Sequence, residues 1–198
     1  MPNPHAAAAA VAATAPIAAP ALCPPATFAE VRARDHVMRY RRSGAGRAVL
    51  VLCAGGGAAP EGGESSPLWP ELPGELAAHF RLIVPEVPAG ATAAGDVAAL
   101  LVDFLDGLGT CGVAVVATDR FCVAALELAL LDADRVARVV LVPGGSAEGT
   151  GLDGALATAG RASSVPLLVV RRGLPAGEAL PLVTRFLAGE PAIRGAAG

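Results

Sequence analysis

Short apolar runs recur along the chain at intervals that also hold helical patterns. The run from Ala48 to Cys53, AVLVLC, is apolar without interruption, which is typical of a parallel strand buried on both faces of a sheet. Similar runs cover residues 81–85, 113–116, 136–142 and 166–171. We therefore predict that these five segments form the parallel strands of one sheet.

Helices are expected between these strands. Asp96 should cap a helix that runs to Leu108, because its apolar residues recur at spacings of three and four, and Gly109 should end it. Further helices are expected over residues 69–79, 123–130, 152–159 and 176–187. Strands that alternate with helices predict a mostly parallel sheet with helices on both faces, which is an α/β fold.

Two segments before the first parallel strand have a different pattern. Residues 28–33 and 37–42 flank Arg34-Asp35-His36, which suits two antiparallel strands joined by a tight turn. We expect a twisted sheet of about six strands in one domain over residues 27–189. The Ala- and Pro-rich residues 1–26 and the last residues, 190–198, are predicted to be flexible tails.

Composition narrows the classes of partner. The chain has 198 residues, 54% of them hydrophobic, which is enough for one domain with a sizeable core. Its net charge is −3, and all 15 basic residues are Arg, a bias that we interpret as a sign of GC-rich coding DNA. The nearest approach to a basic cluster, Arg39, Arg41 and Arg42, fits a solvated strand, so we expect no nucleic-acid partner.

Metal, cofactor and membrane signals are weak. The four cysteines, Cys23, Cys53, Cys111 and Cys122, form no C-x-x-C pair and have no His at metal-ligand spacing. We therefore expect buried free thiols and no metal. No apolar segment approaches the roughly 18 residues of a membrane helix, and the N-terminal stretch lacks the basic region of a secretion signal. A cytoplasmic protein without a nucleotide cofactor is expected, with secretion as the alternative.

The most informative segment is Gly112 to Leu130, GVAVVATDRFCVAALELAL, in which a buried strand meets a helix across residues 117–122. This segment resembles the nucleophile elbow of the α/β-hydrolases, whose motif is G-x-S-x-G. Aligned without gaps, Ala117 takes the first Gly position, Asp119 the Ser position and Phe121 the second Gly position. Residues 132–142, DADRVARVVLV, are similar to the segment that follows the elbow helix in that superfamily. The chain resembles a trimmed α/β-hydrolase without a lid domain.

The same resemblance suggests residues for a ligand site. Ala54-Gly55-Gly56-Gly57 stands where α/β-hydrolases commonly have a His-Gly-Gly-Gly loop, whose backbone N–H groups help to form the oxyanion hole. It implies that Gly55, Gly56 and Gly57 bind substrate, with a flexible Gly-rich turn as the alternative. Trp69 follows as a wall of the ligand site or as a packing residue. Thr118 and Arg120, which flank Asp119, complete the predicted substrate-binding set.

A working Ser-His-Asp triad is not expected. Serine hydrolysis needs a His base and an acid that orients it. Here the last strand leads almost directly into the last helix, so the resemblance implies that the His-bearing segment is missing. His5, His36 and His79 all lie elsewhere in the chain. Glu178 is a poor candidate for the acid because it belongs to the start of the last helix.

Asp119 has three interpretations. In a dry pocket it would be a general acid or base, because desolvation raises the pKa of a carboxyl group. It would otherwise cap the following helix, with Arg120 as a partly exposed partner. The dehalogenases and epoxide hydrolases of the same fold use G-x-D-x-G with Asp as the nucleophile, but Phe121 must then point away or relax the turn. Cys122 is expected to be a buried thiol rather than a nucleophile.

Three functions follow from these interpretations. The first is a repurposed enzyme of specialised metabolism that acts on an apolar small molecule without hydrolysis, by cyclisation, elimination or isomerisation. The second is a catalytically inactive pseudo-hydrolase that binds a ligand, or that stabilises a protein partner or a homodimer. The third is residual hydrolase or thioesterase-like activity with Asp119 in the nucleophile position.

Overall fold

The computed structural model describes residues 26–33, 36–53, 72–88, 90–144, 151–171 and 173–189. Its strands are β1 (Thr27–Ala33), β2 (His36–Ser43), β3 (Ala48–Leu52), β4 (Arg81–Pro85), β5 (Val113–Thr118), β6 (Val136–Val142) and β7 (Leu167–Val169). Its helices are α1 (Leu72–His79), α2 (Ala94–Leu108), α3 (Phe121–Leu131), α4 (Leu152–Ala162) and α5 (Ala176–Ala188). The predicted order of strands and helices is confirmed over these residues.

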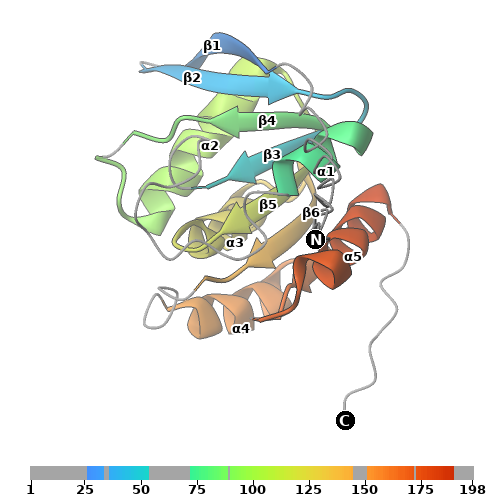
Figure 1. The fold of residues 1–198 in the computed structure, drawn as a ribbon. Helices are drawn as coiled ribbons and strands as arrows, with labels where there is room; N and C mark the ends of the chain where they lie inside the picture. The colour runs from blue at the N-terminus through green and yellow to red at the C-terminus, as the bar shows by residue number, and fades with distance from the viewer. Residues whose placement is uncertain are drawn as a thin grey trace, which may run out of the picture.

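All the described strands lie in one sheet, in the order β1-β2-β4-β3-β5-β6-β7 (Figure 1). The sheet has seven strands, where the sequence predicts about six. The hairpin of β1 and β2 is antiparallel as predicted, and β2 joins β4 in an antiparallel pair as well. From β4 to β7 every pair is parallel, so the carboxyl ends of β3, β5 and β6 lie along the same edge of the sheet.

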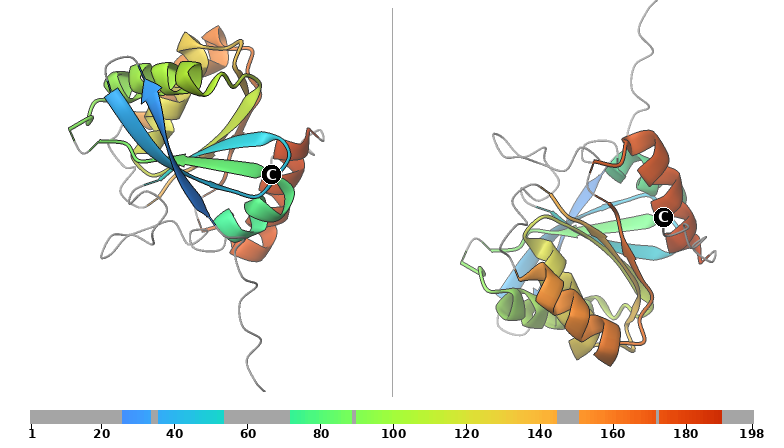
Figure 2. Two further views of the ribbon diagram at one scale, coloured as in Figure 1. Left: turned by 90° about the horizontal axis from the view of Figure 1, so that it is seen from above. Right: turned by 90° about the horizontal axis from the view of Figure 1, so that it is seen from below.

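Helices cover both faces of the sheet, as the alternation of apolar segments predicts. The views from above and below show α2, α3 and α4 on one face and α1 and α5 on the other (Figure 2). The strands supply residues to both layers: Leu50 and Val115 belong to the core under α2 and α3, whereas Val49 and Val116 belong to the core under α1 and α5. This alternation explains why the parallel strands are apolar without interruption.

Helix α2 confirms its predicted apolar face but not its predicted start. Val97, Leu101, Phe104 and Leu105 are buried, and Gly109 ends the helix in the left-handed conformation with φ of 59°. The helix begins earlier than expected, because Ala93 is the N-cap residue and no side chain caps it. Asp96 instead lies in the first turn, where its negative charge interacts favourably with the positive end of the helix dipole.

The cysteines differ in part from the prediction. Cys53 and Cys122 are buried, as expected, but Cys111 is exposed. Cys111 follows Thr110 in the short connection between α2 and β5, where its side chain is exposed to solvent. The predicted Gly55, Gly56, Gly57 and Trp69, together with Cys23 and the predicted tails apart from residue 26, lie outside the described residues. Within the described ranges, no helix has the length and apolar character to cross a membrane.

Candidate functional site

The turn between β5 and α3 is shorter than the sequence predicts. The strand continues through Thr118 and the helix begins at Phe121, so only Asp119 and Arg120 connect them. Asp119 has φ of 49°, and it is the one non-glycine residue with positive φ in the described part of the chain. A sharp strand-to-helix turn with a strained central residue is the geometry of a nucleophile elbow. The structure therefore has a two-residue strand-to-helix turn with a positive-φ residue, Asp119, as a nucleophile elbow would require.

Backbone hydrogen bonds tie this turn to the sheet. The last residue of β5, Thr118, pairs with Val142 at the end of β6. One residue further, the Asp119 N–H donates to the Val142 carbonyl over 3.2 Å, and the Cys122 N–H donates to the Asp119 carbonyl over 3.2 Å. Because both backbone groups of Asp119 are bonded, the surrounding structure holds the residue in its strained conformation.

The carboxyl group of Asp119 is partly withdrawn from water. Among the described residues, its Oδ1 atom is buried and has no hydrogen-bond partner. Burial raises the pKa of Asp119 above its ordinary value of 3.8, while hydrogen bonds from the Thr118 side chain and the Gly144 backbone lower it, and burial has the larger effect. The balance gives a carboxyl group that binds a proton more readily than an exposed aspartate.

Thr118, one of the predicted substrate-binding residues, is buried rather than on an open surface. Its side chain is buried, and its Oγ1 lies 3.4 Å from the Leu52 carbonyl oxygen on the neighbouring strand β3. A hydroxyl group has one proton to donate. When Asp119 is ionised, we expect the proton to face the carboxylate, and when Asp119 is protonated, to face Leu52.

Helix capping, one of the alternatives for Asp119, is wrong. The N-cap residue of α3 is Arg120, in a right-handed helical conformation, and no side chain caps this helix. Arg120 also forms no ion pair with Asp119 among the residues described. Its guanidinium group instead lies 4.6 Å from the centroid of the Phe121 ring, in a cation–π contact. The polar side chain of Asp119 is thus not used by the fold to satisfy the helix end.

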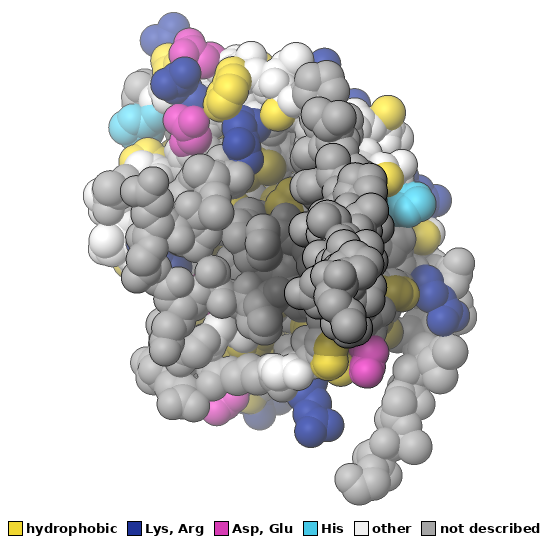
Figure 3. Space-filling view, viewed as in Figure 1, with side chains coloured by type: hydrophobic (Ala, Val, Ile, Leu, Met, Phe, Trp, Pro, Cys, Tyr) yellow, Lys and Arg dark blue, Asp and Glu magenta, His cyan; other side chains and the backbone are white. Residues whose placement is uncertain are grey.

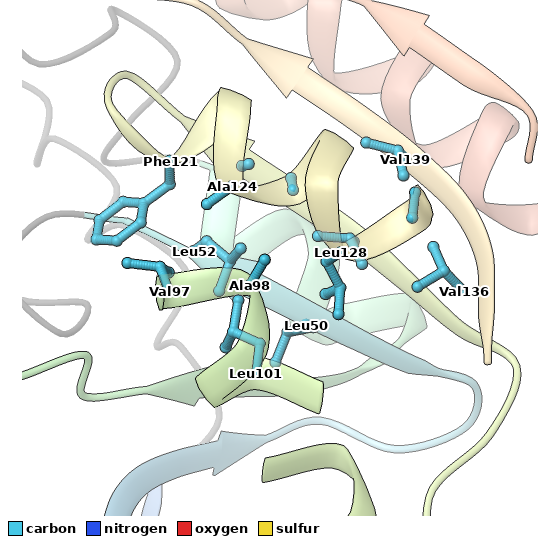
Figure 4. Packing of buried hydrophobic residues seen from close by; sticks show 14 of the residues in the cluster. Leu50, Leu52, Val97, Ala98, Leu101, Phe121, Ala124, Leu128, Val136 and Val139 are labelled. Carbon is cyan, nitrogen blue, oxygen red and sulfur yellow. The ribbon is translucent and has the colours of Figure 1, made fainter. Parts of the chain in front are cut away.

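Phe121 stands where the elbow motif has a glycine, and its large side chain avoids the turn by pointing elsewhere. It is 3% exposed, and its ring points toward α2, where it lies beside Val97 (Figure 4). Ala98 and Leu101 continue this interface along α2. The side chain points away from the strand–helix junction, so the turn keeps its positive φ without the second glycine of the motif.

A cavity of about 260 Å³ lies beside the elbow, between the beginnings of α2 and α3. It is lined by Ala91, Thr92, Ala94, Val97, Arg120, Phe121, Val123 and Ala124. The sequence prediction missed the residues that α2 contributes. The signal was present as the small residues 91–95, ATAAG, since small side chains at a helix start leave space next to a neighbouring helix. Asp119 itself is not among the lining residues.

The two histidines in the described ranges lie away from Asp119. His36 begins β2, which is three strands from β5 and hence about 14 Å across the sheet. His79 ends α1 next to the start of β4, at the edge of the sheet opposite the elbow. Both are exposed, as predicted. No group of three or more metal-ligating side chains occurs within the described residues.

Charged side chains are interspersed on the face of the molecule seen in Figure 3. Dark blue and magenta side chains alternate there among the described residues instead of forming one basic stripe (Figure 3). On β1 and β2, for example, Arg39 faces Glu30 at 3.6 Å. A basic stripe is the electrostatic feature that a nucleic-acid surface needs.

Comparison with known proteins gives matches to solved structures alone, since no protein-family model and no curated protein matches the chain. Similar structures include the epoxide hydrolase CorEH (22% identity, TM-score 0.47) and the haloalkane dehalogenase DatA from Agrobacterium tumefaciens C58 (21%, 0.46). A third is the CarC enzyme, a serine hydrolase involved in carbazole degradation (24%, 0.47). Each match covers 59% of this chain, and respectively 42%, 40% and 47% of the other chain. The chain spans less than half the length of these proteins, which are α/β-hydrolase-fold enzymes, the superfamily that its sequence resembles.

Proposed function

We propose that the chain is a repurposed α/β-hydrolase-fold enzyme that moves a proton on an apolar small molecule without hydrolysing it, with Asp119 as the general acid or base. The reaction would be an elimination, a cyclisation or an isomerisation. One observation carries the proposal: a carboxyl group with a buried, unpartnered oxygen stands on the one strained non-glycine residue of the described chain. Strain of this kind persists where the surrounding structure over-determines it, and it clusters at functional sites.

The environment of Asp119 suits proton transfer. A general base works best when its pKa approaches the operating pH, and burial moves the pKa of Asp119 in that direction. The hydrogen bonds from Thr118 and Gly144 keep the ionised form accessible. The ionised carboxylate would remove a proton from carbon, hold it, and return it to a second atom of the substrate or to water.

The backbone after Asp119 offers a donor for the charge that such a reaction develops. In an elbow, the N–H of the residue after the central residue contributes to the oxyanion hole. Here that residue is Arg120, and among the described residues its N–H donates to no backbone carbonyl. A donor at this place would stabilise an enolate oxygen formed when a proton leaves the carbon next to a carbonyl group.

Hydrolysis through an ester of Asp119 has less support. Cleavage of such an ester needs an activated water, which a His base usually supplies. His36 and His79 lie three strands away and at the opposite edge of the sheet, respectively. The alternative of a ligand-binding pseudo-hydrolase makes a distinct prediction, because Asp119 would then contribute to no reaction. We place the enzyme in cytoplasmic specialised metabolism on the composition of the chain, with neither metal nor cofactor in the proposed reaction.

The test uses a substrate that reports proton abstraction alone. Opening of 5-nitrobenzisoxazole needs a base to remove one carbon-bound proton, and it releases a coloured phenolate. We expect wild type to exceed Asp119→Asn by about 100-fold in kcat/KM. Asp153→Asn, which changes an exposed carboxylate on α4, should match wild type.

Two further measurements separate the alternatives. The wild-type rate should rise with pH through the raised pKa of Asp119, because the ionised form is the base. Neither turnover of p-nitrophenyl acetate nor labelling by a fluorophosphonate probe is expected. Equal rates for wild type and Asp119→Asn would favour the pseudo-hydrolase, and clear esterase activity would favour the hydrolase.

A further inference from the structure

We infer that the cavity between the first turns of α2 and α3 binds a small organic carboxylate with an apolar body, and that Arg120 pairs with its carboxylate group. This inference rests on the proposed function, because it assigns the substrate class of the same turn. It adds a ligand chemistry that the elbow alone does not specify. Its grounds are the lining of the cavity, the placement of Arg120 and the charges around it.

The lining is apolar except at two positions. Ala94 and Val97 come from α2, Val123 and Ala124 come from α3, and Phe121 is the first residue of α3 after the turn. Thr92 supplies a hydroxyl group and Arg120 supplies the one charge in the lining. A volume of about 260 Å³ suits a ligand of small size, and the mixture of apolar walls with few polar groups is usual for a ligand pocket.

Arg120 is held in place by an aromatic ring rather than by a carboxylate. Its guanidinium group lies 4.6 Å from the centroid of the Phe121 ring, which is itself buried beside α2. No Asp or Glu forms an ion pair with Arg120 among the described residues. An aromatic ring supplies no carboxylate or carbonyl oxygen, so this contact leaves the guanidinium N–H groups able to donate to the two oxygens of a carboxylate.

The neighbouring acidic residues do not neutralise this site. Asp96 and Glu127 belong to α2 and α3, but neither lines the cavity. Glu127 faces the start of α2, where its Oε2 lies 3.2 Å from the place that a Cβ on Gly95 would occupy. One guanidinium, which has no ion pair among the described residues, compensates one negative charge. The cavity therefore fits a monocarboxylate better than the dianion of a phosphate monoester.

The position of Arg120 also relates the ligand to Asp119. The two residues are adjacent in the turn, and both are fixed by the ends of β5 and α3. A ligand held by its carboxylate at Arg120 would therefore lie beside the turn that carries Asp119, although Asp119 does not line the cavity. Arg120 would act by positioning the substrate, and Asp119 by moving the proton.

The experiment measures equilibrium binding, so that its outcome is separate from turnover. 4-Phenylbutyrate is titrated against ¹⁵N-labelled protein, with the amide signals of Val97, Val123 and Ala124 as reporters of the cavity. The uncharged 4-phenylbutyramide and phenyl phosphate serve as comparison ligands. We expect Arg120→Gln to weaken 4-phenylbutyrate binding by about tenfold and to change the binding of the amide by less than about twofold. Arg161→Gln, at an exposed position of α4, should bind all three ligands as wild type does.

Each outcome of the titration either supports or contradicts the assignment of a carboxylate ligand to this cavity. Selective loss of 4-phenylbutyrate binding in Arg120→Gln supports it, whatever Asp119→Asn does to the rate of proton abstraction. The inference fails if wild type binds the amide as tightly as the acid, or if Arg120→Gln retains the affinity for the acid. Tighter binding of phenyl phosphate would replace the carboxylate assignment. Signal changes confined to residues outside the cavity would also overturn it.

Discussion

The backbone N–H of Asp119 donates to the carbonyl oxygen of Val142 over 3.2 Å, so the ladder between β5 and β6 extends into the turn. This bond joins the strained residue to the end of a buried strand. A turn with positive φ would otherwise relax, because an L-residue gains stability when it leaves the left-handed region. The sheet therefore maintains the conformation that presents the Asp119 side chain.

Replacements of Asp119 should separate the effect of its backbone from that of its carboxyl group. Asp119→Gly and Asp119→Ala both remove the carboxyl group, but only glycine adopts φ of 49° without strain. We expect the glycine variant to be more stable than the alanine variant by about 1 kcal/mol, since relief of strain exceeds the extra entropy that glycine loses on folding. Urea denaturation of both variants measures this difference. A more stable alanine variant would show that the turn is relaxed.

Ionisation of Asp119 should cost stability at neutral pH. Burial raises the pKa of the folded state above 3.8, so the protonated group favours folding below that pH, and this contribution is lost as pH rises through the raised pKa. An asparagine side chain cannot ionise, and asparagine tolerates positive φ. We therefore expect Asp119→Asn to have a higher Tm than wild type at neutral pH, with a gain that shrinks as the pH falls toward the ordinary pKa of aspartate. A constant gain across this range would contradict the raised pKa, and the exposed Asp153→Asn provides the control.

Thr118 should tune the same pKa. Its hydroxyl group lowers the pKa of Asp119 by a hydrogen bond, and valine has the same shape without this donor. Thr118→Val should therefore raise the pKa of Asp119 further, and the rise of the reaction rate with pH should move to higher pH. A ¹³C NMR titration of the Asp119 carboxyl carbon measures the pKa directly. An unchanged titration would mean that the hydroxyl proton stays with Leu52 in both ionisation states.

Much of the fold was predictable because its signals are local. The apolar run at Ala48–Cys53 and the spacing of apolar residues in α2 each depend on one element and the core it faces. The turn at Asp119 was also predicted, since this residue stands between a buried strand and a helix. The length of this turn was not predicted. Strand β5 gains two residues, Ala117 and Thr118, by pairing with β3 and β6, which are distant in sequence.

The site was less predictable than the fold because it depends on pairs of distant residues. Asp119 was predicted to cap α3 or to act in a pocket, and only the geometry shows that the helix has no side-chain cap. The cavity beside Arg120 needs Ala94 and Val97 of α2, which lie more than twenty residues earlier in the chain. No local pattern around the elbow carries that information. The predicted N-cap of α2 was wrong as well, because Ala93 rather than Asp96 precedes the helix.

The packing of β1 against α2 depends on one glycine. A Cβ at Gly107 would lie 2.5 Å from the Arg32 carbonyl oxygen and 2.8 Å from Val31 Cγ2, so the helix and the edge strand approach closely there. We expect Gly107→Ala to destabilise the protein by about 1–2 kcal/mol, because overpacking exceeds the gain in helix propensity. Gly160→Ala in α4 is the matched control, since its Cβ would meet no atom within 4 Å of the described structure and alanine favours helix by up to about 1 kcal/mol. Changes of opposite sign in the free energy of unfolding, measured by urea denaturation, together with faster hydrogen exchange in β1 for Gly107→Ala, would confirm the close contact. Equal stabilisation of both variants would show that β1 lies further from α2.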